Sequence, residues 1–448
     1  MSPPRTSPPR LSPPRRLPEI DPRHDELIPR TGTGSVKWEY RETAPGHGSG
    51  LEPVADSDVI PMWVADMDFA CPGAVTEAIR RRAGHPIYGY SLPQPGFLDA
   101  FCGWAAARHG FRPDPSWVVP TDGIVPDLGL LVRTLLEPGD GVIVHPPVYF
   151  PFFGAVVNNR ARLAPCPLRR TAAPASGNPY RLDLERFERL AVEPGNRMTI
   201  LCSPHNPVGR AWTREELRAV ARISADAGLI VVSDEIHADL MLEGRPFHPW
   251  LSLASADRSR SIVCSAPSKT FNLAGLKLSC LVIPDPDLRE RVRRARDRRG
   301  FYGVNPLSAA AAEAAWREGG PWLDRVLASL GRNRRLLLRA FARRPGAGAR
   351  AVPPEATYLA WLDFTGTEIP ADRLDDFLVR RARLRLEDGA IFGAEGRGFA
   401  RMNLACPRPL LERALKRLFA ALPGASVLEA VHHAEDAGRA ARDRLENA

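Results

Sequence analysis

Residues 198–209 read Met-Thr-Ile-Leu-Cys-Ser-Pro-His-Asn-Pro-Val-Gly, residues 229–235 read Leu-Ile-Val-Val-Ser-Asp-Glu, and residues 261–269 read Ser-Ile-Val-Cys-Ser-Ala-Pro-Ser-Lys. Each stretch begins with a short apolar run, which is typical of a strand covered on both faces. A helix is predicted between the first two, because Thr213 and Glu216 can form a capping box and Gly228 can end the helix. Strand–helix–strand alternation predicts a parallel α/β sheet.

Apolar runs at 141–145 and 278–283 add strands to this sheet. Farther along the chain, residues 322–343 have a helical pattern and residues 358–363 and 401–404 are strand-like, which predicts a second, smaller α/β domain. A chain of 448 residues is long enough for two domains. We therefore predict a large domain at 76–312, with the small domain divided between 31–75 and 313–424. Residues 425–448 are expected to form a terminal helix or tail.

The N-terminus carries the sequence Ser-Pro-Pro-Arg three times within residues 2–15. Proline fixes φ and removes a backbone donor, so this stretch cannot form a helix or a central strand. We predict a disordered Pro/Arg/Ser-rich tail at 1–30, with a proline-rich docking ligand as the alternative.

Composition limits the functional classes. The net charge is +9, but the densest basic run, 289–299, also contains Glu290 and Asp297, which favours a solvated helix face over a nucleic-acid patch. The seven cysteines form no C-x-x-C pair, which predicts reduced thiols and no zinc site. With no apolar run long enough to span a membrane and no secretory signal, we expect a cytoplasmic protein that binds neither membrane nor nucleic acid.

Three polar side chains follow the three strands quoted first. These are Asn206, Asp234 and Lys269, and parallel strands deliver such residues to one edge of the sheet. An amine, a carboxylate and a donor at one edge match the needs of pyridoxal 5′-phosphate (PLP). That cofactor requires a lysine to form a Schiff base, an acid at the pyridine nitrogen and a donor at the phenolic oxygen.

Further residues can complete a PLP site. Tyr149 follows the strand at 141–145 and is placed to stack on the cofactor ring. Gly123, Ile124 and Val125 open a helical pattern, and a helix N-terminus is a site for a phosphate. Ser268 and Lys277 can add contacts to the same phosphate.

Taken together, these motifs resemble the fold-type I PLP enzymes of the class I/II aminotransferase superfamily, over residues 31–420. Three segments are similar to one branch, the MalY/PatB-type cystathionine β-lyases: Pro-Met-Trp-Val-Ala-Asp-Met-Asp-Phe at 61–69, Ser-Asp-Glu-Ile-His-Ala-Asp-Leu at 233–240 and Ala-Pro-Ser-Lys-Thr-Phe-Asn at 266–272. The resemblance implies a large domain with a mostly parallel seven-stranded sheet and a smaller α/β domain.

The resemblance also implies a role for each residue. Lys269 would hold the cofactor, Asp234 would pair with the pyridine nitrogen, Asn206 would contact the phenolic oxygen and Tyr149 would stack. Arg401 would bind the substrate carboxylate, for which a guanidinium fork is suited. The remaining implied residues are Trp63 at the substrate mouth, with Tyr149, and His237, Ser268, Lys277 and Tyr90 around the cofactor, with Tyr90 approaching the phosphate of a partner subunit.

This sequence departs from the aminotransferase pattern at three positions. His237 stands where many aminotransferases have tyrosine, Ala266 where serine is frequent and Lys277 where arginine is usual. His237 is shared with the lyase branch. The phosphate shell is therefore the part of the site that the resemblance defines least.

The activity implied is that of a PLP-dependent carbon–sulfur β-lyase, which cleaves an S-substituted cysteine to a thiol, pyruvate and ammonia. An aminotransferase of the same fold is the alternative, because it would use the same cofactor residues. An alternative of another class is a regulatory PLP protein that binds a transcription factor. The resemblance further implies a homodimer with shared active sites, whereas the sequence leaves the identity of the thioether open.

Overall fold

The computed structural model describes residues 21–42, 51–53, 58–171, 177–300 and 303–422. A seven-stranded sheet forms the centre of its larger part, in the order β4-β12-β11-β10-β9-β5-β6. The strands are β4 (Val118–Thr121), β5 (Gly141–Val144), β6 (Arg162–Pro165), β9 (Asn196–Cys202), β10 (Ile230–Asp234), β11 (Ser261–Ser265) and β12 (Ser279–Val282). The strand pairs from β11 to β6 are parallel, which confirms the mostly parallel sheet.

One interior strand of the sheet is antiparallel to its neighbours. The run at 278–283 forms β12, which is antiparallel to both of its neighbours, β11 and β4. Residues 266–278 between β11 and β12 contain only a four-residue helix, α8 (Pro267–Thr270), and a short 3-10 turn. Because no long crossover helix returns the chain to the starting edge, the next strand has to run back antiparallel.

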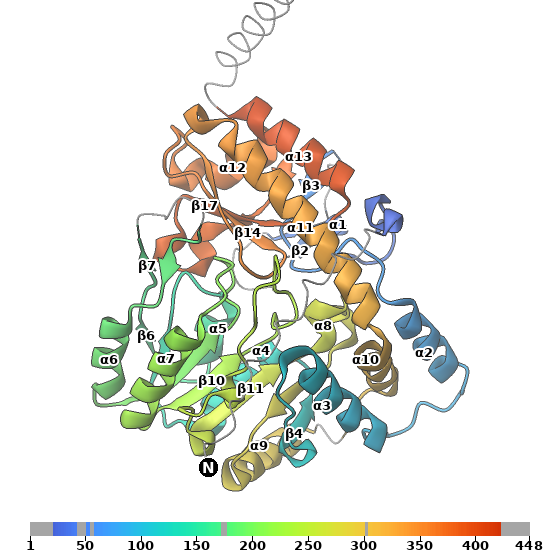
Figure 1. Ribbon diagram of the computed structural model, residues 1–448, viewed down its shortest axis with the longest axis vertical. Helices are drawn as coiled ribbons and strands as arrows, with labels where there is room; N and C mark the ends of the chain where they lie inside the picture. The colour runs from blue at the N-terminus through green and yellow to red at the C-terminus, as the bar shows by residue number, and fades with distance from the viewer. Residues whose placement is uncertain (1–20, 43–50, 54–57, 172–176, 301–302, 423–448) are drawn as a thin grey trace, which may run out of the picture.

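Helices cover both faces of this sheet (Figure 1). On one face, α4 (Ile124–Leu135), α5 (Pro151–Val157) and α9 (Pro286–Arg298) pack on residues such as Val142 and Ile200. On the other face, α3 (Pro95–His109), α6 (Leu184–Val192), α7 (Arg214–Asp226) and α10 (Pro306–Glu318) pack on neighbours such as Leu201 and Val231. The predicted capping box of α7 is present, with Thr213 and Glu216 bonded reciprocally.

A second sheet lies at the other end of the molecule. It is antiparallel, in the order β13-β14-β17-β16, with β13 (Arg350–Val352), β14 (Leu359–Asp363), β16 (Glu387–Asp388) and β17 (Phe399–Asn403). The helices around it are α11 (Gly320–Ala342), α12 (Leu374–Arg380) and α13 (Arg408–Ala421), and α11 extends from this end toward the larger sheet (Figure 1). Further elements are α1 (Val36–Glu39), α2 (Gly73–Ala83), β1 (Tyr40–Glu42), β2 (Leu51–Pro53), β7 (Arg169–Arg170) and β8 (Tyr180–Arg181).

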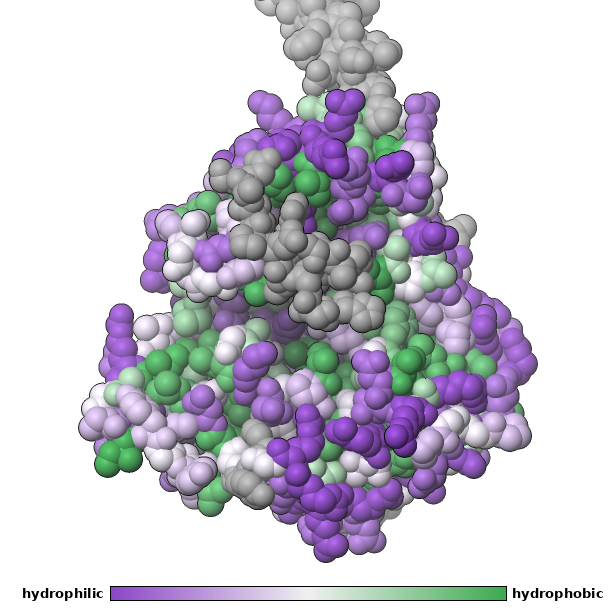
Figure 2. Space-filling view, turned by 180° about the vertical axis from the view of Figure 1, so that it is seen from behind, coloured by the Kyte–Doolittle hydropathy of each residue, from purple (hydrophilic) through white to green (hydrophobic). Residues whose placement is uncertain are grey.

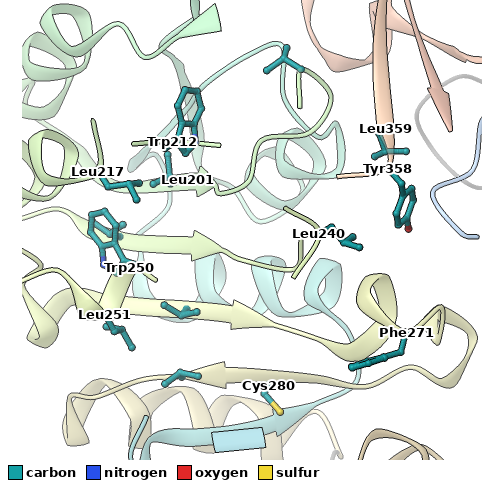
Figure 3. Packing of buried hydrophobic residues seen from close by; sticks show 14 of the residues in the cluster. Leu201, Trp212, Leu217, Leu240, Trp250, Leu251, Phe271, Cys280, Tyr358 and Leu359 are labelled. Atoms are coloured by element: carbon teal, nitrogen blue, oxygen red, sulfur yellow. The ribbon is translucent and has the colours of Figure 1, made fainter. Parts of the chain in front are cut away.

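One hydrophobic cluster extends between the two ends, although the smaller end also has a cluster of its own. Tyr358, which precedes β14, and Leu359, its first residue, belong to the same cluster as Leu201 of β9 (Figure 3). An N-terminal segment also joins the smaller end, because β3 (Ile60–Pro61) pairs in parallel with β15 (Leu384–Arg385). The domain boundaries stay predictions, since this first cluster is continuous between the two sheets.

The predicted tail ends earlier than expected. Residues 22–25 form a 3-10 helix, Asp25 pairs with Arg332 of α11, and Arg30 pairs with Asp66 and Asp68 at 2.6 and 2.9 Å. The prediction of a tail to residue 30 is therefore wrong for residues 21–30, because their charged side chains find partners in the folded part. Residues 1–20 and 423–448 lie outside the described residues.

Within the part of the chain that the structure describes, no helix combines the length and the apolar character needed to cross a bilayer. No cluster of three or more potential metal ligands occurs among these residues either. All seven cysteines are described, and all are unpaired.

Candidate active site

Three adjacent parallel strands bring the predicted polar residues to one edge of the sheet. Asn206 follows β9, Asp234 is the last residue of β10, and Lys269 lies in α8 directly after β11. In the register of the sheet, Asp234 lies opposite Cys202 on one side and Cys264 on the other. The sequence prediction that these three residues share an edge is confirmed.

The Lys269 amine contacts the segment at 61–69, from the N-terminal part of the chain. Its Nζ donates to the Ala65 carbonyl at 2.7 Å, and the Tyr358 hydroxyl donates to the same carbonyl at 2.8 Å. Burial and the nearby charge of Arg401 lower the pKa of Lys269 to about 8, although Asp66 and Asp234 act to raise it. An amine with such a pKa exchanges protons readily near neutral pH, as a nucleophile or general base must.

Asp234 is buried and carries little hydrogen bonding. Its Oδ1 accepts from the Ile236 N–H at 3.2 Å, and this is its one side-chain hydrogen bond among the described residues. Burial raises the pKa of Asp234 to about 7, with Lys269 opposing the shift. A buried carboxyl of this kind is suited to a cationic partner such as a protonated ring nitrogen.

Arg401 is held by three groups. Its Nη1 donates to Asn206 Oδ1 at 3.1 Å, while its Nη2 donates to the Trp63 carbonyl at 3.0 Å and to Glu387 Oε2 at 2.9 Å. Glu387 stands directly opposite Arg401 in the β16–β17 ladder. The guanidinium carbon also lies 5.0 Å from the centre of the Phe392 ring. These contacts fix a buried positive group beside Asn206, at the strand edge that carries Lys269.

Three further predicted residues lie around this centre. Tyr149 precedes α5, and burial raises its pKa to about 12, while Arg401 acts to lower it. His237 is buried 6.1 Å from the Tyr358 ring, and its Nδ1 has no hydrogen-bond partner among the described residues. Burial, followed by the charges of Lys269 and Arg401, keeps the pKa of His237 well below its ordinary value. Trp63 is buried with its indole N–H on the Lys37 carbonyl at 3.1 Å, so its contact with Arg401 comes from the backbone.

The predicted phosphate residues are more exposed. Gly123 precedes α4 with φ of 147°, a conformation that favours glycine, and the first turn of α4 leaves N–H groups without partners inside the helix. Ile124 is buried, Val125 is exposed, Ser268 is half-buried and Lys277 is exposed. Lys277 lines one pocket together with Thr121 and Asp122, which places it near the start of α4.

Tyr90 is fully exposed between α2 and α3. The structure does not bring it to the site within one chain.

The sequence did not single out several residues of the site. Asp66, which acts on the pKa of Lys269, lies in the family-like segment 61–69, and Tyr358 lies in a strand-like run, but neither side chain had an assigned role. Glu387 lacked any local signal, since only the β16–β17 register places it on Arg401. Alternation along a strand cannot reveal which residue faces it on a distant neighbour.

Comparison with known proteins agrees with this geometry. The family described as aminotransferase class I and II matches residues 57–418. The chain belongs to the class I and II aminotransferase family. Among curated relatives, it is 38% identical to cystathionine beta-lyase PatB of Bacillus subtilis, over 89% of this chain and 99% of that protein. It is 31% identical to protein MalY of Escherichia coli, over 89% and 98% of the two chains.

Solved structures of this family are also similar. Cystalysin from Treponema denticola, whose crystal structure contains pyridoxal 5′-phosphate, superposes with a TM-score of 0.81 at 32% identity, over 90% of this chain and 98% of that one. A PLP-bound C-S lyase from Staphylococcus hominis in its external aldimine form gives a TM-score of 0.81 at 29% identity, over 90% and 98%.

The residues present fit the cofactor of these neighbours. The amine of Lys269 and the carboxyl of Asp234 meet at adjacent strand ends, and the open first turn of α4 is a site for an anion. Asp234 has one backbone donor and a pKa near neutrality, so it can accept a charged ring nitrogen without losing an existing partner.

Proposed function

We propose that this chain is a PLP-dependent carbon–sulfur β-lyase that converts an S-substituted cysteine and water to a thiol, pyruvate and ammonia. The observation that carries the use of PLP is the position of Lys269, with its lowered pKa, and of buried Asp234 at adjacent strand ends. The relatives named as cystathionine β-lyases and C-S lyases cover nearly all of the folded chain and support the same reaction.

Each residue then has a task that its surroundings allow. Lys269 would hold the cofactor through its amine, and the same amine would act as the base that removes the proton from Cα. Arg401 binds the α-carboxylate, because its guanidinium is already held in place by Glu387 and the Trp63 carbonyl. Asn206, bonded to Arg401, supplies its amide to the phenolic oxygen, and Tyr149 lies against the ring.

PLP, when bound, supplies an electron sink for the charge left at Cα. Asp234 supports that role by holding the ring nitrogen in its protonated form. The first turn of α4, with Ser268 and Lys277, is proposed to bind the phosphate. His237 and Trp63 are proposed to shape the walls around the cofactor and the substrate mouth.

The reaction balances without any added oxidant or acceptor. The Cα–H and Cβ–S bonds break, the sulfur leaves as a thiolate that takes up a proton, and water releases the nitrogen as ammonia. An aminotransferase would instead retain the amino group on the cofactor and pass it to a keto acid. The two activities therefore differ in whether turnover requires an acceptor.

A substrate screen separates these activities. Purified protein with PLP is incubated with L-cystathionine or other S-substituted cysteines, and pyruvate and free thiol are measured without added keto acid. We expect equal amounts of pyruvate and thiol, with little product from alanine or glutamate even when a keto acid is present. Acceptor-dependent turnover of alanine or glutamate without thiol release would assign the chain to the aminotransferases instead.

We further propose that two copies of this chain form a homodimer with shared sites. Ile87, Tyr88, Tyr90 and Leu92 are all exposed between α2 and α3, an unusual concentration of large apolar side chains for a free surface. Hydrophobic residues also gather across the middle of the face in Figure 2, above a mostly hydrophilic lower end. In such a dimer, Tyr90 would approach the phosphate of the partner's site. The unpaired state of all seven cysteines is in keeping with the proposed cytoplasmic location.

A further inference from the structure

Asp239, on the segment that follows β10, contacts three side chains that can donate hydrogen bonds. Asp239 accepts from the Trp104 indole N–H at 3.1 and 3.2 Å, from the Thr270 hydroxyl at 2.7 Å, and pairs with His109 Nε2 at 2.9 Å. Trp104 and His109 lie five residues apart on α3, whereas Thr270 is the residue that follows Lys269 in α8. None of these four residues belongs to the site described above.

The network is built around an ionised acid. Burial acts to raise the pKa of Asp239, but the charge of His109 and the donated hydrogen bonds outweigh it, so the pKa is lowered overall. Asp239 is therefore an acceptor on both oxygens, and hydrogen bonds to a charged group are the stronger kind. An acid with three donors is a rigid junction between the elements that supply them.

The junction connects the two chemical groups of the site. Asp239 lies five residues after Asp234 on the segment that follows β10, and Thr270 is covalently next to Lys269. We propose that Asp239 is a positioning residue, which fixes Lys269 relative to Asp234 by holding the Thr270 hydroxyl. This inference rests on the function proposed above and adds a residue that acts through another.

A second set of hydrogen bonds, made by Asn272, holds the same turn from the side opposite Thr270. Asn272 donates to the carbonyls of Met67 and Phe69 at 3.0 Å and accepts from the Met67 N–H at 2.9 Å. Between Thr270 and Asn272, the Phe271 ring (Figure 3) packs 5.2 Å from Trp104. Asn272 thus holds this turn against the segment at 67–69, while Thr270 holds it, through Asp239, against α3.

The Thr270 hydroxyl acts on Lys269 through geometry rather than through charge. The charges that act on Lys269 are those of Arg401, Asp66 and Asp234. Removal of the Thr270 hydroxyl should therefore change where the amine lies, and how fast it reacts, without changing the pH at which it titrates.

Thr270→Val is the first test, because it keeps the shape of the side chain and removes the donor, and Thr270→Ser is the matched control that keeps the donor. The holoenzymes are compared for kcat and KM with an S-substituted cysteine. Cofactor-stripped proteins are compared for the rate at which Lys269 reacts with added PLP, followed by absorbance across pH. We expect Thr270→Val to lower kcat and the rate of PLP attachment by about 5- to 100-fold. KM and the pH midpoint of the absorbance change should stay within about twofold and a few tenths of a pH unit, and Thr270→Ser should recover most of the loss.

Asp239→Asn is the second variant, and it should reproduce the loss in kcat, because an amide cannot accept from all three donors. The proposal is overturned if Thr270→Val keeps the wild-type kcat and attachment rate, or if Thr270→Ser is as slow as Thr270→Val. It is also overturned if thermal stability falls while both rates, measured well below the melting temperature, do not change. A failure of the proposed function would appear differently, as wild-type protein that attaches PLP but does not turn over an S-substituted cysteine. The rate of PLP attachment tests the position of Lys269 without any amino acid substrate.

Discussion

The two ends of the cofactor site differ in how far one chain completes them. At the amine end, Lys269, Asp234 and Arg401 are held by hydrogen bonds that come from the same chain. At the phosphate end, Val125, Lys277 and Tyr90 are exposed in the single chain. The amine end is therefore held within one chain, whereas the homodimer proposed above would complete the phosphate end.

The largest effect is expected at the amine end. Lys269→Ala removes both the point of cofactor attachment and the base at Cα, so turnover should fall by at least about 10²–10⁴-fold. The absorbance band of lysine-bound PLP should also be lost. Lys277→Ala is the matched control from the phosphate end, and it should weaken PLP binding while leaving that band in place at saturating PLP. A normal band in the Lys269→Ala protein would show that another amine holds the cofactor.

Loss of the acid at the amine end should have the next largest effect. Asp234→Asn keeps the shape of the side chain but cannot hold the ring nitrogen as a cation. Since a hydrogen bond to a charged group contributes about 1.5–3 kcal/mol, turnover should fall by roughly 10- to 150-fold. The measurement is kcat at saturating PLP, which separates turnover from weaker binding. Near-normal turnover would mean that another group protonates the ring.

The sequence could predict the amine end because its signal is local. Each of Asn206, Asp234 and Lys269 follows a buried strand, and parallel order alone places them together. Glu387 and Asp239 could not be assigned in this way, because their partners are set by a distant register and by the packing of α3. The sequence left the direction of β12 open for a related reason, since an apolar run does not indicate which way a strand points.

A mixing experiment tests the claim that the phosphate end is shared. Tyr90→Ala alone should lower the affinity for PLP by several-fold, because an aromatic hydroxyl contributes about one hydrogen bond and its packing. When Tyr90→Ala and Lys269→Ala chains are mixed and allowed to exchange, half of the sites in each mixed dimer regain both residues. We therefore expect activity at limiting PLP to rise above that of either variant alone. A mixture no more active than the sum of its parts, in a preparation shown to contain mixed dimers, would contradict shared sites.

The titration of Asp234 predicts a pH-dependent stability in the cofactor-free protein. Its pKa is raised from 3.8 to about 7 by burial, so the folded state holds a proton that the unfolded chain releases between these values. Stability is therefore lost as the pH rises from about 4 to 7. Asp234→Asn removes this loss and should raise Tm by a few degrees at pH 7 but not at pH 4. Thermal melts of both cofactor-free proteins at the two pH values provide the check, and an equal shift at both would exclude this titration as the cause.

The smallest effects concern the N-terminus. Deletion of residues 1–20 should leave turnover and Tm unchanged, because a stretch with three Ser-Pro-Pro-Arg repeats cannot form a helix or a central strand. Deletion of residues 1–30 also removes Arg30, which holds Asp66 and Asp68 in the segment that accepts from Lys269. Each partly buried ion pair contributes on the order of 1 kcal/mol, so Tm should fall by a few degrees and kcat by a few-fold.

Arg30→Ala in the full-length chain distinguishes the contribution of the Arg30 guanidinium from that of the other deleted residues. It should lower kcat as much as the longer deletion does while lowering Tm less, since Asp25 still pairs with Arg332. If both deletions behave like the wild type, the contacts of Arg30 do not secure the segment above Lys269. The placement of that segment would then depend on its other contacts, which include those of Asn272, Tyr358 and Asn403. The difference between the two ends of the site would not rest on the N-terminal residues.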